Sequence, residues 1–371
     1  MKNIEINEVE DWIETVTSTL PDFLDRMRDP LEDGRFKYSL SGDLNFEERW
    51  GLGNSVFATK ILYMLGAETQ YPTSSIAKYI QSFQNQKGEI FDPLISKKSG
   101  WYRSLYCVVD RDFNNFVGTQ TRRAESRQSF AALRALQRPP EYCYQLAPST
   151  VDEVKKYVHS LNWNKPWNAG SHFSHMIFFL KSNDWWPRSK LVESPSEKIN
   201  ELIDAAFDEI SVYRQESGAW FQGGGSPSTA EQVSGAMKIT NAYMAAEKDS
   251  IGKEEKLIDL CLGLTINPDA CNNFNLVLVL YYASKRTSYR RSDIYRFCLT
   301  AISLYKRHYW SKTKGFSFFV GRSNHRYYGA RLTKGLPEPD IHATHLYLWG
   351  IVLISNMLEL SVRKRLREPI T

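Results

Sequence analysis

Residues 340–354 read DIHATHLYLWGIVLI, a stretch in which apolar side chains occupy nearly every position after the first turn. A helix that is apolar nearly all round has no face suited to water, so it must be buried on every side. Five further stretches share this character, and they are residues 54–65, 125–136, 171–180, 232–243 and 272–283. The sequence therefore predicts six buried helices.

A second set of helices has a single apolar face. In the clearest case Ser194, Pro195 and Glu197 form a start signal, and apolar residues then recur at helical spacing as far as Ile210. Another such helix starts after Thr150, whose hydroxyl has the spacing of a cap for Glu153. Further members are expected near residues 9–27, 74–84, 253–263 and 290–309. These helices should lie outside the buried ones.

Short turns connect the two sets. Most of the turns carry Gly or Pro beside an aromatic residue, and they are expected at 34–36, 88–91, 166–167, 218–220 and 315–316. The order of outer helix, turn and inner helix recurs six times, at intervals of 40 to 71 residues. Solenoid repeats have nearly fixed periods, whereas a closed ring needs none. The pattern predicts an all-α fold with one domain over residues 1–371, a single α6/α6 toroid in which an inner ring of parallel helices surrounds a central cavity.

Composition narrows the class of protein. The 371 residues are 42% hydrophobic and 13% aromatic, with a net charge of +5, which is typical of a folded globular chain. Five cysteines without a C-x-x-C motif exclude a disulfide scaffold and favour a reducing compartment. We find no signal peptide and no apolar run long enough for a transmembrane segment, so a cytoplasmic location is expected. The basic run at 363–367 is interpreted as a solvated helix end, and no nucleic acid is expected as a partner. The oligomeric state stays open.

Polar residues gather near the starts of the predicted buried helices. Parallel inner helices would bring these starts to one end of the cavity, where free N–H groups suit anions. A single polar residue there is more often a cap, but Arg, Gln and two H-x-x-H pairs together favour an active site. The candidate catalytic residues are Glu125, His172, His175, Asp340, His342 and His345. The candidate substrate-binding residues are Arg127, Gln128, Trp167, Trp220, Gln232, Asn273, Arg322 and Arg331.

A basic loop precedes the last buried helix and suggests the charge of the ligand. Arg322, Arg326, Arg331 and Lys334 lie within thirteen positions of one another. Guanidinium groups bind phosphate and carboxylate in two-point fashion. We therefore expect a small-molecule anionic substrate at the end of the cavity where the inner helices begin, with no cofactor and no bound metal.

Part of the chain resembles a known family. Residues 329–350, with Lys334, Asp340, His342 and a Tyr-Leu-Trp-Gly helix, resemble the end of protein prenyltransferase β subunits, and Asp269-Ala270-Cys271 resembles the Asp-x-Cys zinc ligands of that family. The wider group includes terpenoid cyclases of the same α/α toroid fold. The resemblance implies cyclisation or prenyl transfer on an isoprenoid or its diphosphate. However, Ala343 stands where that family has its histidine ligand, and the Asp-x-Asp-Asp and Asp-rich magnesium motifs of the cyclases are missing.

Three functions remain open at this point. Isoprenoid chemistry would use Asp340 as the acid, oriented by His342 or His345, between Trp167 and Trp220. A lyase or epimerase acting on an anionic sugar would instead draw its base from His172 or His175, its anion contact from Arg127 and Gln128, and its acid from Tyr327 or Tyr328. A non-catalytic toroid that binds a partner would need the polar residues only as caps.

Overall fold

The structure is a computed structural model, and it describes residues 2–44, 49–95, 105, 119–183, 185, 196–224, 227–266, 269–328 and 330–370. The chain is mostly helical. The α-helices are α1 (Lys2–Met27), α2 (Leu52–Leu65), α3 (Thr73–Gln81), α5 (Thr119–Ala135), α6 (Val151–Ser160), α7 (Pro166–Ser182), α8 (Ser196–Ile210), α9 (Thr229–Ala245), α10 (Glu254–Leu262), α11 (Ala270–Ser284), α12 (Arg291–His308) and α13 (Ile341–Met357). Short 3-10 turns are η1 (Glu68–Gln70), η3 (Ser211–Tyr213) and η4 (Ser361–Arg365).

Strands are few and short. The strand β1 (Tyr309–Trp310) pairs antiparallel with β2 (Gly315–Phe316), with Tyr309 opposite Phe316. The strand β3 (Arg326–Tyr327) pairs antiparallel with β4 (Ala330–Arg331), with Tyr327 opposite Ala330. The second pair belongs to the loop that precedes α13, and this loop reaches the functional site described below.

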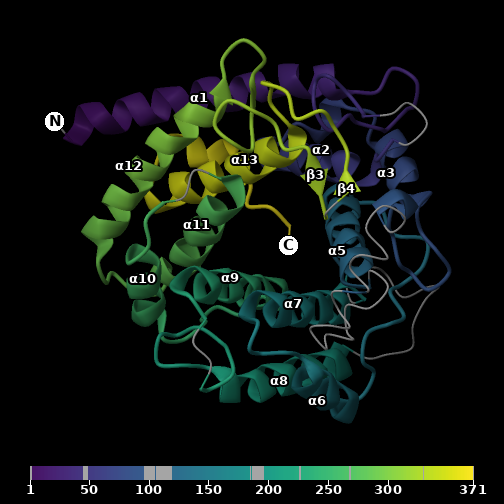
Figure 1. Ribbon diagram of the computed structural model, residues 1–371, viewed down its shortest axis with the longest axis vertical. Coiled ribbons are helices and arrows are strands. Elements are labelled where there is room, and N and C mark those ends of the chain that lie inside the picture. The colour runs from purple at the N-terminus through teal and green to yellow at the C-terminus, as the bar shows by residue number, and fades with distance from the viewer. Residues whose placement is uncertain are drawn as a thin grey trace.

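Six of the described helices contact one another in a closed order. The helix α2 packs on α5, α5 on α7, α7 on α9, α9 on α11, α11 on α13, and α13 again on α2. Figure 1 shows these helices around the centre of the molecule, with α1, α3, α6, α8, α10 and α12 outside them. The helices of the closed order correspond to the six stretches predicted to be buried, and the others to the one-faced helices.

Burial agrees with the two predicted kinds of helix. The helices α2, α7, α11 and α13 are buried along nearly their whole length. By contrast, α6 buries only Val154 and Val158 among its residues. The side chain of Thr150 accepts the predicted capping hydrogen bond from the N–H of Glu153. Helix type and the cap of α6 were thus readable from the sequence, while the start signal predicted at Ser194 and Pro195 lies outside the described residues.

The predicted turns are tight antiparallel pairings between an outer helix and the next inner one. Isolated bridges join Arg28 to Phe36, Gln84 to Ile90 and Arg214 to Trp220, and β1–β2 has the same place in the chain. The corresponding turn residues Gly34, Gly88 and Gly218 have φ of 82° to 83°, which favours glycine. One expectation is wrong: Pro166 and Trp167 form the first turn of α7, because proline fits the first helical position.

Two inner helices begin earlier than the apolar pattern predicts. The helix α5 starts at Thr119 and α7 at Pro166, six and five residues before the predicted starts. The residues before the predicted starts, TQTRRA in α5 and PWNAG in α7, contain one large apolar side chain, Trp167, so they show no apolar period. As a consequence Glu125, Arg127, His172 and His175 lie in the second or third turn and not at the helix N-termini. The dipole argument made for these positions therefore does not apply to them.

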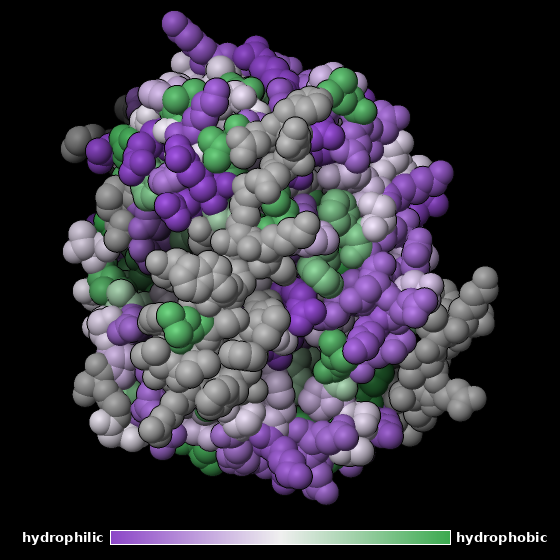
Figure 2. All heavy atoms as spheres, turned by 45° about the vertical axis from the view of Figure 1, so that its right-hand side comes forward, coloured by the Kyte–Doolittle hydropathy of each residue, from purple (hydrophilic) through white to green (hydrophobic). Residues whose placement is uncertain are grey.

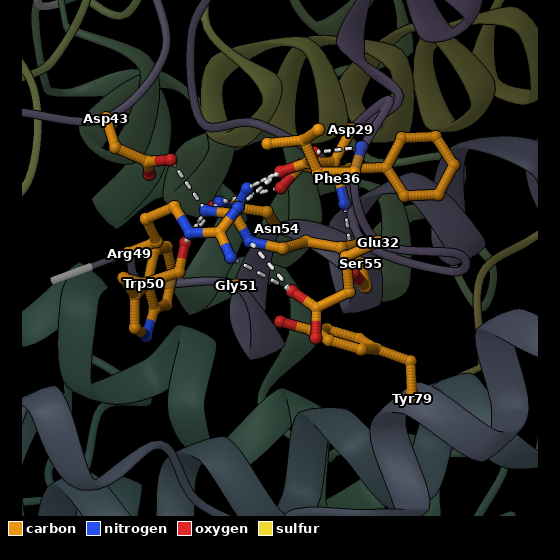
Figure 3. A network of polar contacts seen from close by, with 12 residues as sticks. Asp29, Glu32, Phe36, Asp43, Arg49, Trp50, Gly51, Asn54, Ser55 and Tyr79 are labelled. Carbon is orange, nitrogen blue, oxygen red and sulfur yellow. Dashed lines mark hydrogen bonds and ion pairs between the residues drawn. The ribbon is translucent and has the colours of Figure 1, made fainter. Parts of the chain in front are cut away.

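A buried arginine ties the segment after α1 to the start of α2. Arg35 is 2% exposed, and its guanidinium pairs with the carboxylates of Asp29 and Asp43, the latter at 2.7 Å. It also donates to the carbonyl of Trp50 at 3.4 Å. Arg49 pairs with Asp29 at 3.3 Å, so two cations share that carboxylate (Figure 3). These contacts fix Trp50, whose ring packs against Tyr327 of the loop that precedes α13.

The basic segment near the end of the described chain is paired, unlike the solvated helix end that was expected. Arg365 contacts Glu14 of α1, and Arg367 contacts Glu68, both at 2.6 Å. The N–H of Arg367 donates to the carbonyl of Met64 at the end of α2. This segment therefore covers helix ends in the middle of the view in Figure 1. Within the described residues no helix is both long and apolar enough to cross a membrane.

Gly34 and Gly42 form a matched pair that tests the packing of the first turn. Both have positive φ, of 82° and 78°. A Cβ on Gly34 would lie 2.4 Å from the carbonyl oxygen of Ser75, whereas nothing lies within 4 Å of a Cβ on Gly42. We expect Gly42→Ala to cost about 1–2 kcal/mol of unfolding free energy for backbone strain. Gly34→Ala should cost about 1–3 kcal/mol more. Denaturant titrations measure both losses of unfolding free energy, and equal losses in the two variants would contradict the close contact between Gly34 and the Ser75 carbonyl.

Candidate functional site

A cavity of about 330 Å³ lies among α2, α5, α7, α9, α11 and α13. The loop before α13 completes its wall with Phe318, Asn324 and residues 326–328. The cavity residues are basic (Lys60, Arg127, Lys238, Arg326), imidazole (His342, His345), amide (Gln128, Asn241, Asn275, Asn324), and apolar or aromatic with one thiol (Phe57, Trp167, Met237, Cys271, Phe274, Phe318, Tyr327, Tyr328, Leu346, Trp349). No aspartate or glutamate is among the described residues that line it. Its size falls within the range of small-molecule sites.

Three basic side chains from three helices face the cavity without an acidic partner. Lys60 comes from α2, Arg127 from α5 and Lys238 from α9. The amine of Lys60 donates a hydrogen bond to Oε1 of Gln128. The Arg127 guanidinium lies 5.3 Å from the ring centre of Phe178, and the Lys238 amine lies 5.3 Å from that of Trp167. None of the three basic groups forms an ion pair within the described part of the chain.

Burial lowers the pKa of each basic group, and the charge of Arg127 lowers it further at the two lysines. Burial lowers the pKa of Arg127 to about 10, so this guanidinium stays charged at neutral pH. Burial, together with the charge of Arg127, lowers the pKa of Lys238 to about 8. The same two causes hold the pKa of Lys60 well below its ordinary value. At neutral pH the cavity therefore holds charged Arg127 and largely charged Lys238, and the amine of Lys60 loses its proton more easily than an ordinary lysine does.

The two imidazoles of α13 are stacked and uncharged. The Phe57 ring lies 4.8 Å from His342 and 5.2 Å from His345, in both cases nearly parallel. Burial lowers the pKa of His342 to about 4. Burial and the neighbouring Lys60 hold the pKa of His345 well below its ordinary value. Both rings are therefore neutral and can accept a proton or a hydrogen bond.

Several cavity residues carry buried polar atoms that have no partner within the described chain. These atoms are Nε of Arg127, Oδ1 of Asn241, Nδ1 of His342, both ring nitrogens of His345 and Nε1 of Trp349. A buried polar group without a hydrogen bond costs free energy, so native proteins rarely keep one without a reason. Other buried polar atoms without a partner lie outside the cavity, but those on its lining are placed where a bound polar molecule can complete their hydrogen bonding.

Asp340, the predicted acid, caps α13 and does not line the cavity. Its Oδ1 accepts from the N–H of Ala343 at 2.8 Å, and its Oδ2 accepts from the N–H groups of Phe318 and Asn324, both at 3.0 Å. Burial raises the pKa of Asp340 to about 7, although these three backbone donors oppose the rise. Three directed donors are the environment of an ionised carboxylate. The geometry favours a structural role that holds the cavity loop on α13 over the predicted acid role.

Glu125 lies behind the cavity wall. Its two oxygens accept from the indole N–H of Trp50 at 3.0 Å and from the backbone N–H of Asp92 at 2.9 Å. Burial and the nearby Asp92 carboxylate raise the pKa of Glu125 to about 8, so it keeps its proton at neutral pH. The Trp50 ring lies 4.6 Å from that of Tyr327, which does line the cavity. Glu125 therefore positions the wall through Trp50 and does not contact the cavity itself.

The first histidine pair also lies outside the cavity lining. Nδ1 of His172 contacts the guanidinium of Arg123. His175 is buried, and its pKa is held well below the ordinary value by burial and by Arg127. Because His175 is close to Arg127 and Lys238, it supports the basic side of the cavity from behind.

The structure separates the predicted binding residues into two groups. Arg127, Gln128 and Trp167 line the cavity, together with His342 and His345 of the catalytic set. Trp220 is 1% exposed and packs against Arg214, which lies 4.3 Å from its ring centre. The other four predicted residues also lie outside the lining. Gln232 forms hydrogen bonds with Ser217 and Pro227, and Asn273 donates one to the carbonyl of Asp269. The guanidinium of Arg322 lies over the ring of Phe319, and Arg331 is exposed on β4.

Sequence reasoning missed Lys60 and Lys238, although a signal was present. Each is a lysine inside a stretch that is otherwise apolar or small, in VFATKILYML and GAMKITNAY respectively. A lysine within a helix predicted to be buried on every side must be paired or face a polar cavity, because burying an isolated ammonium is costly. The same argument applies to Asn241.

The zinc ligands implied by the family resemblance do not come together here. Asp269 caps α11 by accepting from the N–H and the amide of Asn272, at 2.9 and 2.6 Å. Cys271 and His342 line the cavity, but among the described residues no group of three acidic, cysteine or histidine side chains is placed to hold a metal ion. Comparison with protein families, curated proteins and solved structures finds no match to this chain.

The capping role of Asp340 is testable by an isosteric change. In Asp340→Asn an amide NH₂ replaces one acceptor oxygen and faces backbone donors, so we expect a loss of about 1–3 kcal/mol of unfolding free energy. The matched control is Asp269→Asn, because Asp269 caps α11 with one backbone donor and is half-buried. It should lose about 1 kcal/mol or less. Chemical denaturation measures both, and a neutral Asp340→Asn variant would refute the capping role.

Proposed function

We propose that the chain is a single α/α toroid whose central cavity binds and converts a small anionic molecule. The closed contact order of α2, α5, α7, α9, α11 and α13 supports the toroid. The observation that carries the function is the set of Lys60, Arg127 and Lys238 in a cavity whose described lining has no carboxylate. Buried cations gather without counter-charge where an anion binds, because the ligand then supplies the missing charge.

The first candidate substrate is an anionic sugar, converted by acid–base chemistry. Arg127 and Lys238 would hold its carboxylate or phosphate, and the amides of Gln128, Asn241 and Asn275 suit its hydroxyl groups. The neutral imidazoles of His342 and His345 supply a base, and Tyr327 and Tyr328 are hydroxyl donors on the same wall. A lyase or epimerase needs this combination of anion contact, base and acid.

The second candidate is an isoprenoid diphosphate, as the family resemblance implied. Met237, Phe274, Leu346 and Trp349 give the cavity an apolar wall that suits a hydrocarbon chain. Cyclisation would also need a carboxylic acid in the cavity or a carboxylate-held magnesium ion. The described lining has no carboxylate, and Asp340 and Glu125 both face other donors. The polar wall therefore favours the sugar over the isoprenoid.

The partner-binding toroid receives the least support. On the face drawn in Figure 2, hydrophobic residues occur in small groups separated by hydrophilic ones. The exposed large hydrophobic residues come from separate parts of the chain, for example Leu31, Leu146, Val212 and Leu336. A protein-docking surface is usually a contiguous apolar patch. The basic groups of Lys60, Arg127 and Lys238 line the cavity instead.

Anion binding is the direct test of the proposal. We expect isothermal titration calorimetry to detect binding of glucuronate or pyrophosphate to the wild-type protein. Arg127→Met should weaken it roughly ten- to a hundred-fold, because a charge-assisted contact contributes about 1.5–3 kcal/mol. Arg331→Met is the matched control, since Arg331 is exposed outside the lining, and it should bind as the wild type does. Tighter binding of farnesyl diphosphate than of glucuronate would favour the isoprenoid class of substrate. An anion affinity that is unchanged in Arg127→Met would refute the site.

A stability measurement tests whether Lys60 serves function at the expense of folding. Lys60→Met removes a buried amine, so we expect unfolding free energy at pH 7 to rise by about 1–4 kcal/mol. Because the pKa of Lys60 is lowered in the folded state, folding releases a proton, and stability rises with pH up to the ordinary lysine value. The gain in Lys60→Met should therefore be largest at low pH and shrink as pH rises.

The control for this stability experiment is Lys248→Met, which removes a surface lysine paired with Asp204 at 2.8 Å. It should change stability by less than about 1 kcal/mol, without the pH trend. A Lys60→Met variant less stable than the wild type at pH 6 would show that the amine stabilises the fold.

A further inference from the structure

We propose that the amine of Lys60 forms a covalent imine with an anionic aldehyde or 2-oxo acid held in the central cavity. The proposal rests on the anion binding described above and adds a reaction to it. It names carbonyl compounds as the substrate class, which includes anionic sugars in their open-chain form.

The position of Lys60 suits a nucleophile. It lines the cavity from the middle of α2, is 3% exposed, and is fixed by its hydrogen bond to Gln128. That bond uses one N–H, and the amine forms no ion pair within the described chain, so no carboxylate there stabilises its charged form. The uncharged amine is the reactive form, and burial together with the charge of Arg127 lowers the pKa of Lys60, which increases the share of that form.

Lys238 serves as the matched comparison inside the same cavity. Its amine lies over the ring of Trp167, a contact that favours the charged ammonium. With a pKa of about 8 it is mostly protonated at neutral pH. Lys238 and Arg127 are therefore suited to hold the carboxylate or phosphate of the carbonyl compound, while Lys60 attacks its carbon.

Imine formation requires two proton transfers, and a neutral imidazole lies beside Lys60 to carry them. The Lys60 nitrogen forms a bond to the carbonyl carbon, and one amine proton passes to the carbonyl oxygen, which gives a carbinolamine. The C–O bond then breaks, the nitrogen lone pair forms the C=N bond, the second amine proton leaves with the hydroxyl group, and one water is released. His345 neighbours Lys60, is neutral, and has both ring nitrogens unpartnered. It can therefore take the proton from nitrogen and return it to the departing hydroxyl.

The experiment traps the imine as a stable secondary amine. The full chain is incubated at pH 7 with glyoxylate, the probe, and sodium cyanoborohydride, and the adduct is located by peptide mass spectrometry. We expect one adduct on Lys60, its loss in Lys60→Arg, and unchanged labelling in Lys248→Arg. The neutral aldehyde glycolaldehyde should label Lys60 at least about tenfold more slowly, because it lacks the charge-assisted contact to Arg127.

Each other outcome has a defined meaning. Labelling spread over surface lysines, or a principal adduct on Lys238, would overturn the proposal. If pyrophosphate or glucuronate binds by calorimetry but glyoxylate gives no adduct on Lys60, the imine is refuted and the anion site stands. If neither binding nor adduct is found, both proposals fail. If Lys60→Arg does not fold, the wild-type protein is labelled in the presence of excess pyrophosphate. An occupied cavity should prevent the glyoxylate adduct on Lys60, and undiminished labelling would overturn the proposal.

Discussion

The fold depends on one constraint, which is that its inner helices must be covered on every side. A helix such as α13, buried from Ile341 to Ser355 almost without interruption, has no surface that water can stabilise. Its neighbours α2 and α11 cover two sides and outer helices such as α12 cover a third. The fourth side faces the centre, where side chains from six helices converge but do not fill the space. A cavity at that point follows from the arrangement itself.

The character of the cavity follows from what is buried around it. An apolar centre could have been closed with larger hydrophobic side chains, at a gain in stability. This chain instead places Lys60, Arg127 and Lys238 there, and their lowered pKa values show what burial costs their charged forms. Natural sequences depart from the most stable choice mainly where function requires it. The basic groups and the unpaired atoms of His345 are such departures, and they line the same cavity.

The sequence was sufficient for helix type and order, but not for the site. Apolar periodicity locates the inner helices, and Thr150 marks the start of α6 correctly. The helices α5 and α7 extend past their predicted starts through residues without an apolar period, so the pattern misplaces Arg127 and His172 along their helices. A polar residue at a helix start can be a helix cap or a functional residue, and sequence spacing cannot distinguish the two roles. Asp340 is a cap because the N–H groups of Phe318 and Asn324 fold back onto it, and only the three-dimensional path of that loop reveals this.

The cavity wall is also linked to a part of the chain that sequence reasoning left aside. Arg35 and Asn54 both donate to the carbonyl of Trp50, at 3.4 and 2.8 Å, so the salt-bridge network near α1 fixes this residue. The Trp50 indole then donates to Glu125, and its ring packs against Tyr327 of the cavity. Because Glu125 keeps its proton, this contact adds no negative charge behind the wall. The charge of Arg127 therefore has no buried carboxylate at Glu125 to offset it, so Arg127 can both hold an anion and lower the pKa of the Lys60 amine.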